Sequence, residues 1–273
     1  MCMNKYIQVE IQTISTEQSE LLMAELSVIG FEGFEEDENL LKAFIPEKDF
    51  AETLIDEIAA RNEVSYYQTT IEETNWNAVW ESNFEPVTIE NFVGIRAHFH
   101  ESIKGVEHEI VITPKMSFGT GHHATTFMMI QQMKEIDFAN KKVFDFGTGT
   151  GILAILAERL GAEKILAVDN DDWSIENTKE NLERNNCVKV DLKKADDASM
   201  NENFDIVLAN INKNVILENF LLLTQQLKPG GVLLLSGLLE EDEKDILSAA
   251  GKFSLLLRKI TKNSNWISLR FSS

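Results

Sequence analysis

Val143-Phe-Asp-Phe-Gly-Thr-Gly-Thr-Gly-Ile-Leu153 is the stretch of the sequence that decides the fold. Its apolar start, residues 143–146, predicts a strand, and the apolar residues from position 152 predict a helix. Between them stand three glycines at alternate positions, Gly147, Gly149 and Gly151. Because glycine has no Cβ atom, this turn can bring the backbone close to a ligand. A strand, a glycine turn and a helix in this order are typical of a nucleotide-binding site.

An acidic residue, Asp169, follows the next predicted strand, residues 164–168. An acid about 20 residues after a glycine turn can accept hydrogen bonds from both hydroxyls of a ribose. The spacing G-x-G-x-G differs from the G-x-G-x-x-G with which dinucleotide-binding proteins hold a pyrophosphate at a helix N-terminus. The stretch therefore predicts a ligand with an adenosine part, and both S-adenosylmethionine and a nicotinamide dinucleotide remain open.

The composition is that of a folded intracellular protein. The chain has 273 residues, of which 44% are hydrophobic, enough for two domains with ample cores. It has no run of about 18 apolar residues that could span a membrane, and its start lacks the apolar core of a signal peptide. The two cysteines, Cys2 and Cys187, cannot build a disulfide framework. We therefore expect a cytoplasmic protein without a membrane partner.

The chain is strongly acidic, with a formal net charge of -20. This charge argues against direct nucleic-acid binding, which needs a basic surface, and favours a basic partner or simply solubility. Residues 1–72 contain 16 acids and 4 bases, a net of -12, so about a quarter of the chain carries more than half of the charge. The same residues contain no histidine and no glycine-rich loop, and they carry no catalytic signature.

The pattern of predicted elements divides the chain into three parts. Residues 1–72 follow the order β-α-β-β-α-β, which predicts a small α+β ferredoxin-like domain. Residues 73–91 are expected to form a connector, in which Trp76, Val79, Trp80 and Phe84 have helical spacing. Residues 92–273 alternate strands and helices, which predicts an α/β domain with a doubly wound parallel sheet and an antiparallel edge made by the last two strands.

A small, polar loop precedes the glycine turn. Residues 114–126 contain two glycines, several hydroxyls and the pair His122 and His123. We expect no metal site, because adjacent residues on a helix point apart and the loop has no Cys, Asp or Glu. His123 is a candidate general base, although a helix-capping or packing role is favoured. Farther on, Asp196 or Asp197 stands where such folds commonly bind the adenine amino group, and each could equally belong to a solvated turn.

Four stretches together resemble one family. They are Ser-Phe-Gly-Thr-Gly-His-His-Ala-Thr-Thr, the glycine turn, Val-Asp-Asn-Asp and Ala-Asn-Ile-Asn, and with Trp76, Trp80 and Ser236-Gly237 they are similar to the PrmA family, the methyltransferases of large-subunit ribosomal protein L11. The resemblance implies a class I S-adenosylmethionine-dependent methyltransferase with a Rossmann-like domain. It implies S-adenosylmethionine as cofactor and α-amino and lysine ε-amino groups of the basic ribosomal protein as acceptors.

The resemblance also implies roles for individual residues. Those expected to bind the cofactor are Phe118, Gly119, Thr120, Gly121, Thr126, Gly147, Gly149, Asp169 and Asn210. The first four would form a loop over the cofactor, and Asn210 would be the catalytic residue. The sequence departs from the family pattern at three positions, where His122, Ala124 and Asn212 stand in place of threonine, proline and leucine.

Methyl transfer from a sulfonium to an amine is a direct in-line displacement that depends on positioning. Asn210 follows a predicted strand and could accept a hydrogen bond from the amine, or it could cap the next helix. Other interpretations remain: a methyltransferase for a small molecule or another protein, a non-catalytic S-adenosylmethionine-binding partner of the ribosome, and a nicotinamide dehydrogenase.

Overall fold

The structure is a computed structural model and describes residues 5–13, 15–37, 40–72, 84–114 and 121–273. The chain forms two compact units, Met1–Val79 and Trp80–Ser273, here named the N-terminal unit and the C-terminal unit. The predicted helical spacing of Trp76, Val79 and Trp80 lies outside the described residues. No helix in the described part of the chain is both long and apolar enough to cross a membrane.

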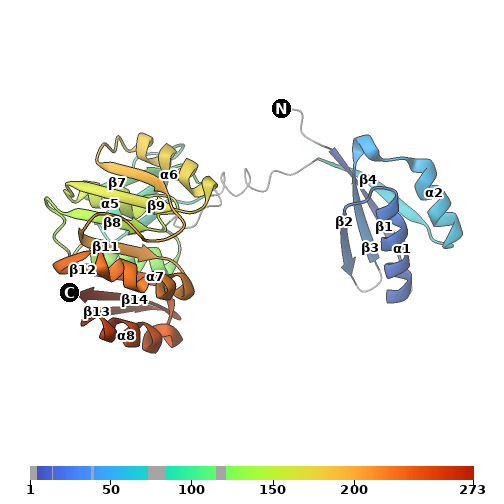
Figure 1. Ribbon diagram of the computed structural model, residues 1–273. Helices are drawn as coiled ribbons and strands as arrows, with labels where there is room; N and C mark the ends of the chain where they lie inside the picture. The colour runs from blue at the N-terminus through green and yellow to red at the C-terminus, as the bar shows by residue number, and fades with distance from the viewer. Residues whose placement is uncertain (1–4, 14, 38–39, 73–83, 115–120) are drawn as a thin grey trace. The chain divides into compact units, whose positions relative to one another are not determined.

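The described residues of the N-terminal unit form an antiparallel sheet with the helices α1 and α2 beside it (Figure 1). Its elements are β1 (Lys5–Gln12), α1 (Thr16–Val28), β2 (Gly33–Asp37), β3 (Leu40–Pro46), the short 3-10 helix η1 (Glu47–Asp49), α2 (Glu52–Arg61) and β4 (Tyr66–Glu72). The strand order is β2-β3-β1-β4, and each pair of neighbours is antiparallel. This order confirms the predicted ferredoxin-like domain.

The core of the N-terminal unit follows from the alternation in β1. Ile7, Val9 and Ile11 are buried on one side of the strand, because successive side chains of a strand point to opposite faces. They pack with Leu22 and Leu26 of α1, which are fully buried. One face of the sheet is thus covered by apolar residues of the helices.

The C-terminal unit begins with a small sheet of β5 (Val87–Ile89), β6 (Val93–Ala97) and β7 (His108–Ile112). β5 lies within the range expected to be a connector, because three residues after a proline give too short a pattern to identify as a strand. β6 pairs with β5 in the antiparallel and with β7 in the parallel direction. The two strands that begin the range 92–273, β6 and β7, are therefore parallel neighbours.

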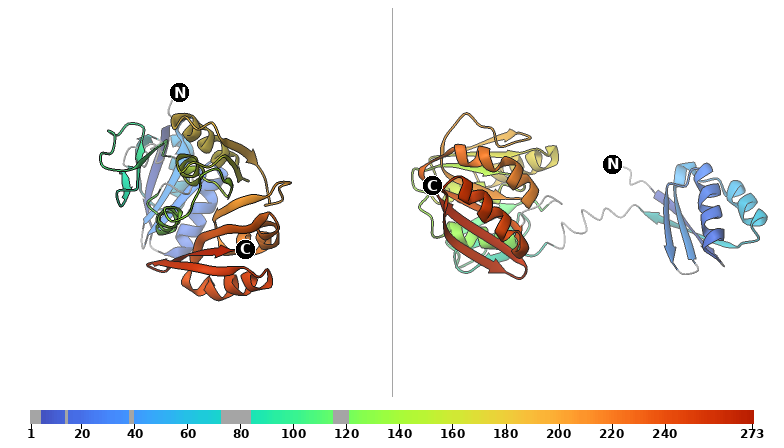
Figure 2. Two further views of the ribbon diagram at one scale, coloured as in Figure 1. Left: turned by 90° about the vertical axis from the view of Figure 1, so that its left-hand side faces the viewer. Right: turned by 60° about the horizontal axis from the view of Figure 1, so that its bottom comes forward.

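A seven-stranded sheet forms the rest of the unit. Its helices and strands are α4 (Ala124–Met133), β8 (Lys142–Phe146), α5 (Ile152–Arg159), β9 (Lys164–Asp169), α6 (Asp172–Arg184), β10 (Val190–Lys194), β11 (Phe204–Asn210), α7 (Lys213–Gln225), β12 (Leu227–Leu239), η2 (Glu240–Asp242), α8 (Glu243–Lys252), β13 (Leu256–Asn263) and β14 (Trp266–Ser272). The helices cover both faces of the sheet (Figure 2).

The strand order of this sheet is β10-β9-β8-β11-β12-β14-β13. The first five strands are parallel, and β14 runs antiparallel to both of its neighbours. The last strand of the chain therefore inserts between β12 and the edge strand β13. This is the class I methyltransferase arrangement, and it confirms the predicted doubly wound sheet with an antiparallel pair at one edge.

The order of the strands also predicts where a ligand binds. The chain runs outward from β8 to β10 and then returns to the other side of β8 with β11. At such a reversal the loops after two neighbouring strands leave in opposite directions and open a crevice at their carboxyl ends. The carboxyl ends of β8 and β11 are Phe146 and Asn210, so the glycine turn and Asn210 face the same crevice.

Candidate active site

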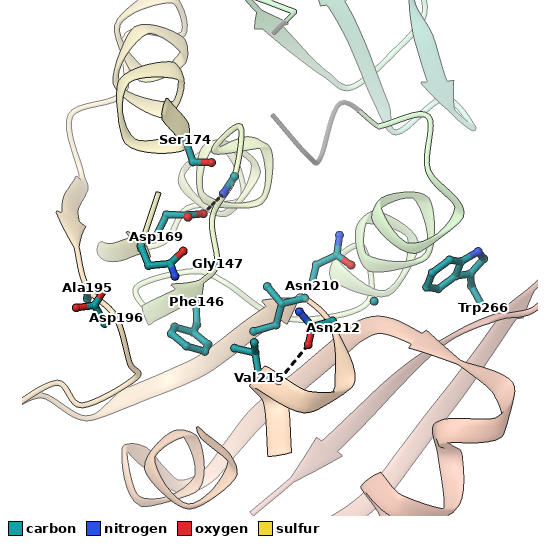
Figure 3. Close-up of a pocket in the computed structure, with 14 residues that line it drawn as sticks. Phe146, Gly147, Asp169, Ser174, Ala195, Asp196, Asn210, Asn212, Val215 and Trp266 are labelled. Atoms are coloured by element: carbon teal, nitrogen blue, oxygen red, sulfur yellow. Dashed lines mark hydrogen bonds between the residues drawn. The ribbon is translucent and has the colours of Figure 1, made fainter. Parts of the chain in front are cut away.

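A cavity of about 530 Å³ lies at this crevice (Figure 3). Its size is in the range usual for small-molecule sites. Asp169 and Asp196 lie toward one end of the cavity and Asn210 and Trp266 toward the other. The residues that line it are Phe146, Gly147, Gly149, Asp169, Asn170, Ser174, Ala195, Asp196, Asn210, Ile211, Asn212, Val215, Gly237 and Trp266.

The glycine turn forms one wall of the cavity. The backbone N–H groups of Gly147 and Thr148 both donate to the carbonyl oxygen of Val168 at 2.9 Å, which ties the turn to β9. Gly147 has a φ of 75°, and a Cβ atom there would lie 2.3 Å from Cγ2 of Ile211. A side chain at this position would therefore collide with Ile211, so the close approach requires glycine.

Asp169 stands at the end of β9 with its carboxylate fixed by two backbone donors. Its Oδ2 accepts a hydrogen bond of 2.9 Å from the N–H of Gly149, and its Oδ1 accepts one of 3.1 Å from the N–H of Asp171. A carboxylate has about four acceptor positions, so two remain for a ligand. The arrangement suits a group with two adjacent hydroxyls, such as a ribose.

A second carboxyl group, Asp145, supports the turn from the interior. Asp145 is fully buried in β8, and its Oδ2 accepts a hydrogen bond of 2.7 Å from the hydroxyl of Thr148. Burial, with a smaller contribution from the nearby charge of Asp169, raises the pKa of Asp145 to about 7, although the Thr148 hydrogen bond opposes the shift. Sequence reasoning did not single out this residue, because a lone acid within an apolar strand gives no distinctive signal.

Asn210 lies at the end of β11, and the nitrogen end of its side-chain amide is fixed by a hydrogen bond. Its Nδ2 donates a hydrogen bond of 3.1 Å to Oγ1 of Thr126, in the first turn of α4. Its Oδ1 is buried and has no hydrogen-bond partner among the described residues. The other role predicted for Asn210, capping of the next helix, belongs to Asn212, whose Oδ1 accepts from the N–H of Val215 at 3.1 Å.

The two acids after β10 have different surroundings. Asp196 lines the cavity. Asp197 instead accepts hydrogen bonds from both the N–H and the hydroxyl of Ser199, which makes it part of a local turn. Of the two candidates for the adenine amino group, Asp196 is therefore the one that lies at the cavity wall.

The predicted loop before α4 is described only in part. Phe118, Gly119 and Thr120 lie outside the described residues. Gly121 has a φ of 94°, and a Cβ atom there would lie 2.5 Å from Cδ1 of Ile95. The glycine at this position is thus required by both its conformation and its neighbour.

The two histidines of the loop take structural positions. His123 is the N-cap of α4, where its Nδ1 accepts a hydrogen bond of 3.3 Å from the N–H of Thr125. Its ring also meets that of Trp266 edge to face at 4.7 Å between centroids. His122 meets Phe84 edge to face at 4.8 Å. Capping and packing, the favoured expectation for these histidines, is what the structure shows.

Several lining residues were missed by sequence reasoning. Trp266 is the first residue of the last strand, and nothing local connects it with a site 56 positions earlier at Asn210. Gly237 was noted only as part of the resemblance. Its role is steric, because a Cβ atom there would lie 2.3 Å from the carbonyl oxygen of Ile211.

Comparison with known proteins gives a consistent result over nearly the whole chain. The family model described as "Ribosomal protein L11 methyltransferase (PrmA)" matches residues 2–273. The chain is similar to a ribosomal protein L11 methyltransferase of Porphyromonas gingivalis, with 40% identity over 93% of this chain and 90% of the relative. It is similar to one of Chlorobaculum tepidum, with 39% identity over 93% and 92% of the two chains.

Among solved structures, the chain is similar to the crystal structure of a ribosomal protein L11 methylase from Lactobacillus delbrueckii subsp. bulgaricus. The two share 26% sequence identity with a TM-score of 0.65, over 69% of this chain and 98% of the other.

Proposed function

Because the chain belongs to the family of ribosomal protein L11 methyltransferases, we propose that it methylates the α-amino group and lysine ε-amino groups of ribosomal protein L11. The chain is a methyltransferase with S-adenosylmethionine as its cofactor. The resemblance noted in four short stretches of sequence is thus confirmed over residues 2–273. The identity of the acceptor amines and the roles of individual residues are the proposal.

The cavity fits the cofactor by size and by the chemistry of its walls. We assign Asp169 to the two ribose hydroxyls, Gly147 and Gly149 to close backbone contact, and Asp196 to the adenine amino group. Phe118, Gly119, Thr120 and Gly121 would cover the cofactor. Thr126 lines a small cavity together with Gly147 and Asn210, and it would also contact the cofactor. When bound, S-adenosylmethionine supplies a methyl group on a positively charged sulfur, which an amine can attack directly.

The single observation that carries the proposed chemistry is that Oδ1 of Asn210 is buried and has no hydrogen-bond partner among the described residues. A buried acceptor without a hydrogen-bond partner is costly, at roughly 1–3 kcal/mol, so such atoms call for an explanation. An amine that reaches Asn210 would supply the missing donor. When its N–H is held by Oδ1 of Asn210, its lone pair can be directed at the methyl group.

The acceptor must be neutral to react. An α-amine has an ordinary pKa of about 8 and is partly neutral near pH 7, whereas a lysine with a pKa of about 10.4 is almost fully charged. The residues of this site act by positioning, which can lower a barrier by roughly 7–11 kcal/mol when reacting atoms are held in line. We therefore expect the α-amine to react at lower pH than the lysines.

For the N-terminal unit we propose recruitment of the substrate. Its net charge of -12 over residues 1–72 is suited to a basic ribosomal protein in the cytoplasm. Three of its four bases, Lys42, Lys48 and Arg61, already form ion pairs with acids of the same unit. The excess of acids over bases therefore remains as a negative field around the unit.

Mass spectrometry tests the proposal. Purified L11 is incubated with the protein and S-adenosylmethionine, and its peptides are mapped for added methyl groups. We expect methyl groups on the N-terminal residue and on lysines. L11 with an acetylated N-terminus is the control. Its α-amino group is blocked, so we expect methyl groups on its lysines alone. Absence of any methylation on L11, with turnover of another protein or a small amine, would reject the proposed substrate.

A further inference from the structure

The buried face of α6 is polar, whereas a helix that packs on a sheet usually buries an apolar stripe. Its buried residues are Ser174, Asn177, Thr178, Asn181 and Leu182, of which only the last is apolar. Thr178 and Asn181 are 0% exposed. A buried amide or hydroxyl is costly unless it forms hydrogen bonds, so the partners of these side chains show what the polar face does.

Thr178 and Asn181 hold the glycine turn through its carbonyl groups. Oγ1 of Thr178 donates a hydrogen bond of 2.6 Å to the carbonyl oxygen of Gly149, and Nδ2 of Asn181 donates one of 2.8 Å to that of Thr150. Neither side chain is among the described residues that line the large cavity or the small one. Their contact with the site therefore runs through the backbone of the turn.

The amide of Asn181 is oriented by a partner at each end. Its Oδ1 accepts a hydrogen bond of 2.8 Å from the N–H of Thr113, the residue after β7. Because Oδ1 only accepts and Nδ2 only donates, this N–H fixes which end of the amide faces Thr150. Asn177 supports the same anchor, since its Nδ2 donates to the carbonyl oxygen of Thr113 at 3.1 Å.

We propose that Thr178 and Asn181 are positioning residues for S-adenosylmethionine binding, which fix the glycine turn so that Gly149 holds the carboxylate of Asp169 in place for the ribose. This inference rests on the proposed placement of the ribose at Asp169. Gly149 connects the two sides, because its carbonyl oxygen accepts from Thr178 while its N–H donates to Oδ2 of Asp169. The contacts therefore run from α6 through the turn to the acid.

The turn needs these outside donors because of its composition. Gly149 has a φ of 58°, and glycine has more conformational freedom to lose than any other residue. Without the donors of α6, the turn could adopt other conformations, in which its N–H no longer meets Asp169. Part of the binding free energy of the cofactor would then be consumed in restoring the conformation that binds it.

Two leucine variants of α6 form a matched pair. Asn181→Leu and Asn185→Leu each remove a buried amide that accepts from a backbone N–H, of Thr113 and of Val111 respectively. They differ in where the amide donates. Nδ2 of Asn181 donates to Thr150 in the glycine turn, whereas Nδ2 of Asn185 donates to the carbonyl oxygens of Val111 in β7 and of Asn181 in α6.

A second pair isolates the hydroxyl of Thr178. Thr178→Ala and Thr178→Ser differ from each other by the hydroxyl alone, so only the serine variant can keep the donor to Gly149. This pair decides the test if Asn181→Leu does not fold. For each variant we measure Kd for S-adenosylmethionine by calorimetry and the melting temperature without ligand, so that binding is separated from stability.

We expect Kd to rise about tenfold in Asn181→Leu and about fivefold in Thr178→Ala relative to Thr178→Ser. Asn185→Leu should lower the melting temperature while its Kd stays within about twofold of the wild-type value, because its bonds do not reach the turn. In an Asp169→Ala background, Asn181→Leu should raise Kd by less than about threefold, since the acid that the turn positions is already gone.

Either of two outcomes would overturn the inference. One is an equal rise of Kd in Asn185→Leu and Asn181→Leu, which would assign the effect to the fold in general. The other is wild-type affinity in Asn181→Leu, or equal affinity in Thr178→Ala and Thr178→Ser. Unchanged affinity in Asp169→Ala would instead reject the placement of the ribose. Weakened affinity there, together with wild-type affinity in Asn181→Leu, would reject the role of α6 alone.

Discussion

The backbone N–H of Gly149 donates a hydrogen bond of 2.9 Å to Oδ2 of Asp169, which joins the glycine turn to the acid at the end of the neighbouring strand. The two features that the sequence separates by 20 residues are therefore in direct contact. Because the same carboxylate also accepts from the N–H of Asp171, its position at the cavity wall is set before any ligand binds.

Replacement of Asp169 by alanine is expected to weaken S-adenosylmethionine binding by about tenfold or more, because each charge-assisted hydrogen bond to the ribose contributes roughly 1.5–3 kcal/mol. Isothermal titration calorimetry measures the change. Asp197→Ala is the matched control, since it removes an acid that belongs to a local turn, and its affinity should equal that of the wild type. Unchanged affinity in Asp169→Ala would show that the carboxylate does not hold the cofactor.

Replacement of Asn210 by alanine is expected to lower kcat by about tenfold or more with a smaller effect on cofactor Kd, because its acceptor acts mainly on the in-line geometry. Asn219→Ala serves as the control, as it removes a buried amide that bonds the backbones of Ala198 and Val215 and does not itself line the cavity. That variant should lose stability and keep kcat. If Asn210→Ala instead weakens cofactor binding at constant kcat, Asn210 is a cofactor ligand.

The buried carboxyl of Asp145 predicts a pH dependence of stability. Its pKa is raised from 3.8 to about 7, first by burial, so between these values the folded protein holds a proton that the unfolded chain has released. The free energy of unfolding should therefore fall as the pH rises from about 4 to about 7. Asp145→Asn lacks this contribution. Urea denaturation of both proteins measures the free energy of unfolding at each pH in this range. As the pH rises, the wild type should lose stability relative to the variant. Free energies of unfolding that change with pH in parallel for the two proteins would contradict this prediction.

Gly121→Ala is expected to lower the melting temperature more than Gly105→Ala. Both glycines have a positive φ, 94° and 83°, so the backbone strain is comparable. A Cβ atom at Gly121 meets Cδ1 of Ile95 at 2.5 Å, whereas one at Gly105 meets nothing within 4 Å. Adding Ile95→Val, which removes Cδ1, should recover part of the loss. Equal melting temperatures for the two alanine variants would show that the contact is relieved without cost.

Electrostatic recruitment by the N-terminal unit predicts a steep salt dependence. Catalytic efficiency on L11 should fall as ionic strength rises above about 0.1 M, where charges are screened beyond about 10 Å, while cofactor affinity stays nearly constant. A fragment that begins at Glu73 should still bind S-adenosylmethionine and scarcely methylate L11. If that fragment acts at the full-length rate, the acids of the N-terminal unit serve solubility.

Much of the architecture was predictable because it depends on neighbours in the chain. The two alternating patterns, β-α-β-β-α-β in residues 1–72 and the strands and helices after them, predicted the four-stranded and the seven-stranded sheet. The prediction was weaker where an element has too few residues to show a pattern. Val87–Ile89 has only three residues, so it was assigned to a connector.

The candidate site was predictable where a local pattern or the family resemblance identifies its residues. The glycine turn and Asp169 were identified from their spacing, and Asn210 and Thr126 from the resemblance to the family. The choice between Asp196 and Asp197 could not be made from the sequence, because two adjacent acids differ only in the direction of their side chains. Trp266 was missed because its proximity to the cavity depends on the last strand inserting between β12 and β13.

By itself, the sequence determined the order of strands and helices, the glycine turn and the acid that follows it, since these depend on periodicity and on conformations that glycine alone adopts freely. Only the tertiary structure decided that Thr126 meets Asn210, 84 residues away, and that Asn212 rather than Asn210 caps α7. The physical reason is that these contacts are set by how strands pair and helices pack, and no local pattern of residues specifies which distant side chains then lie within hydrogen-bonding distance.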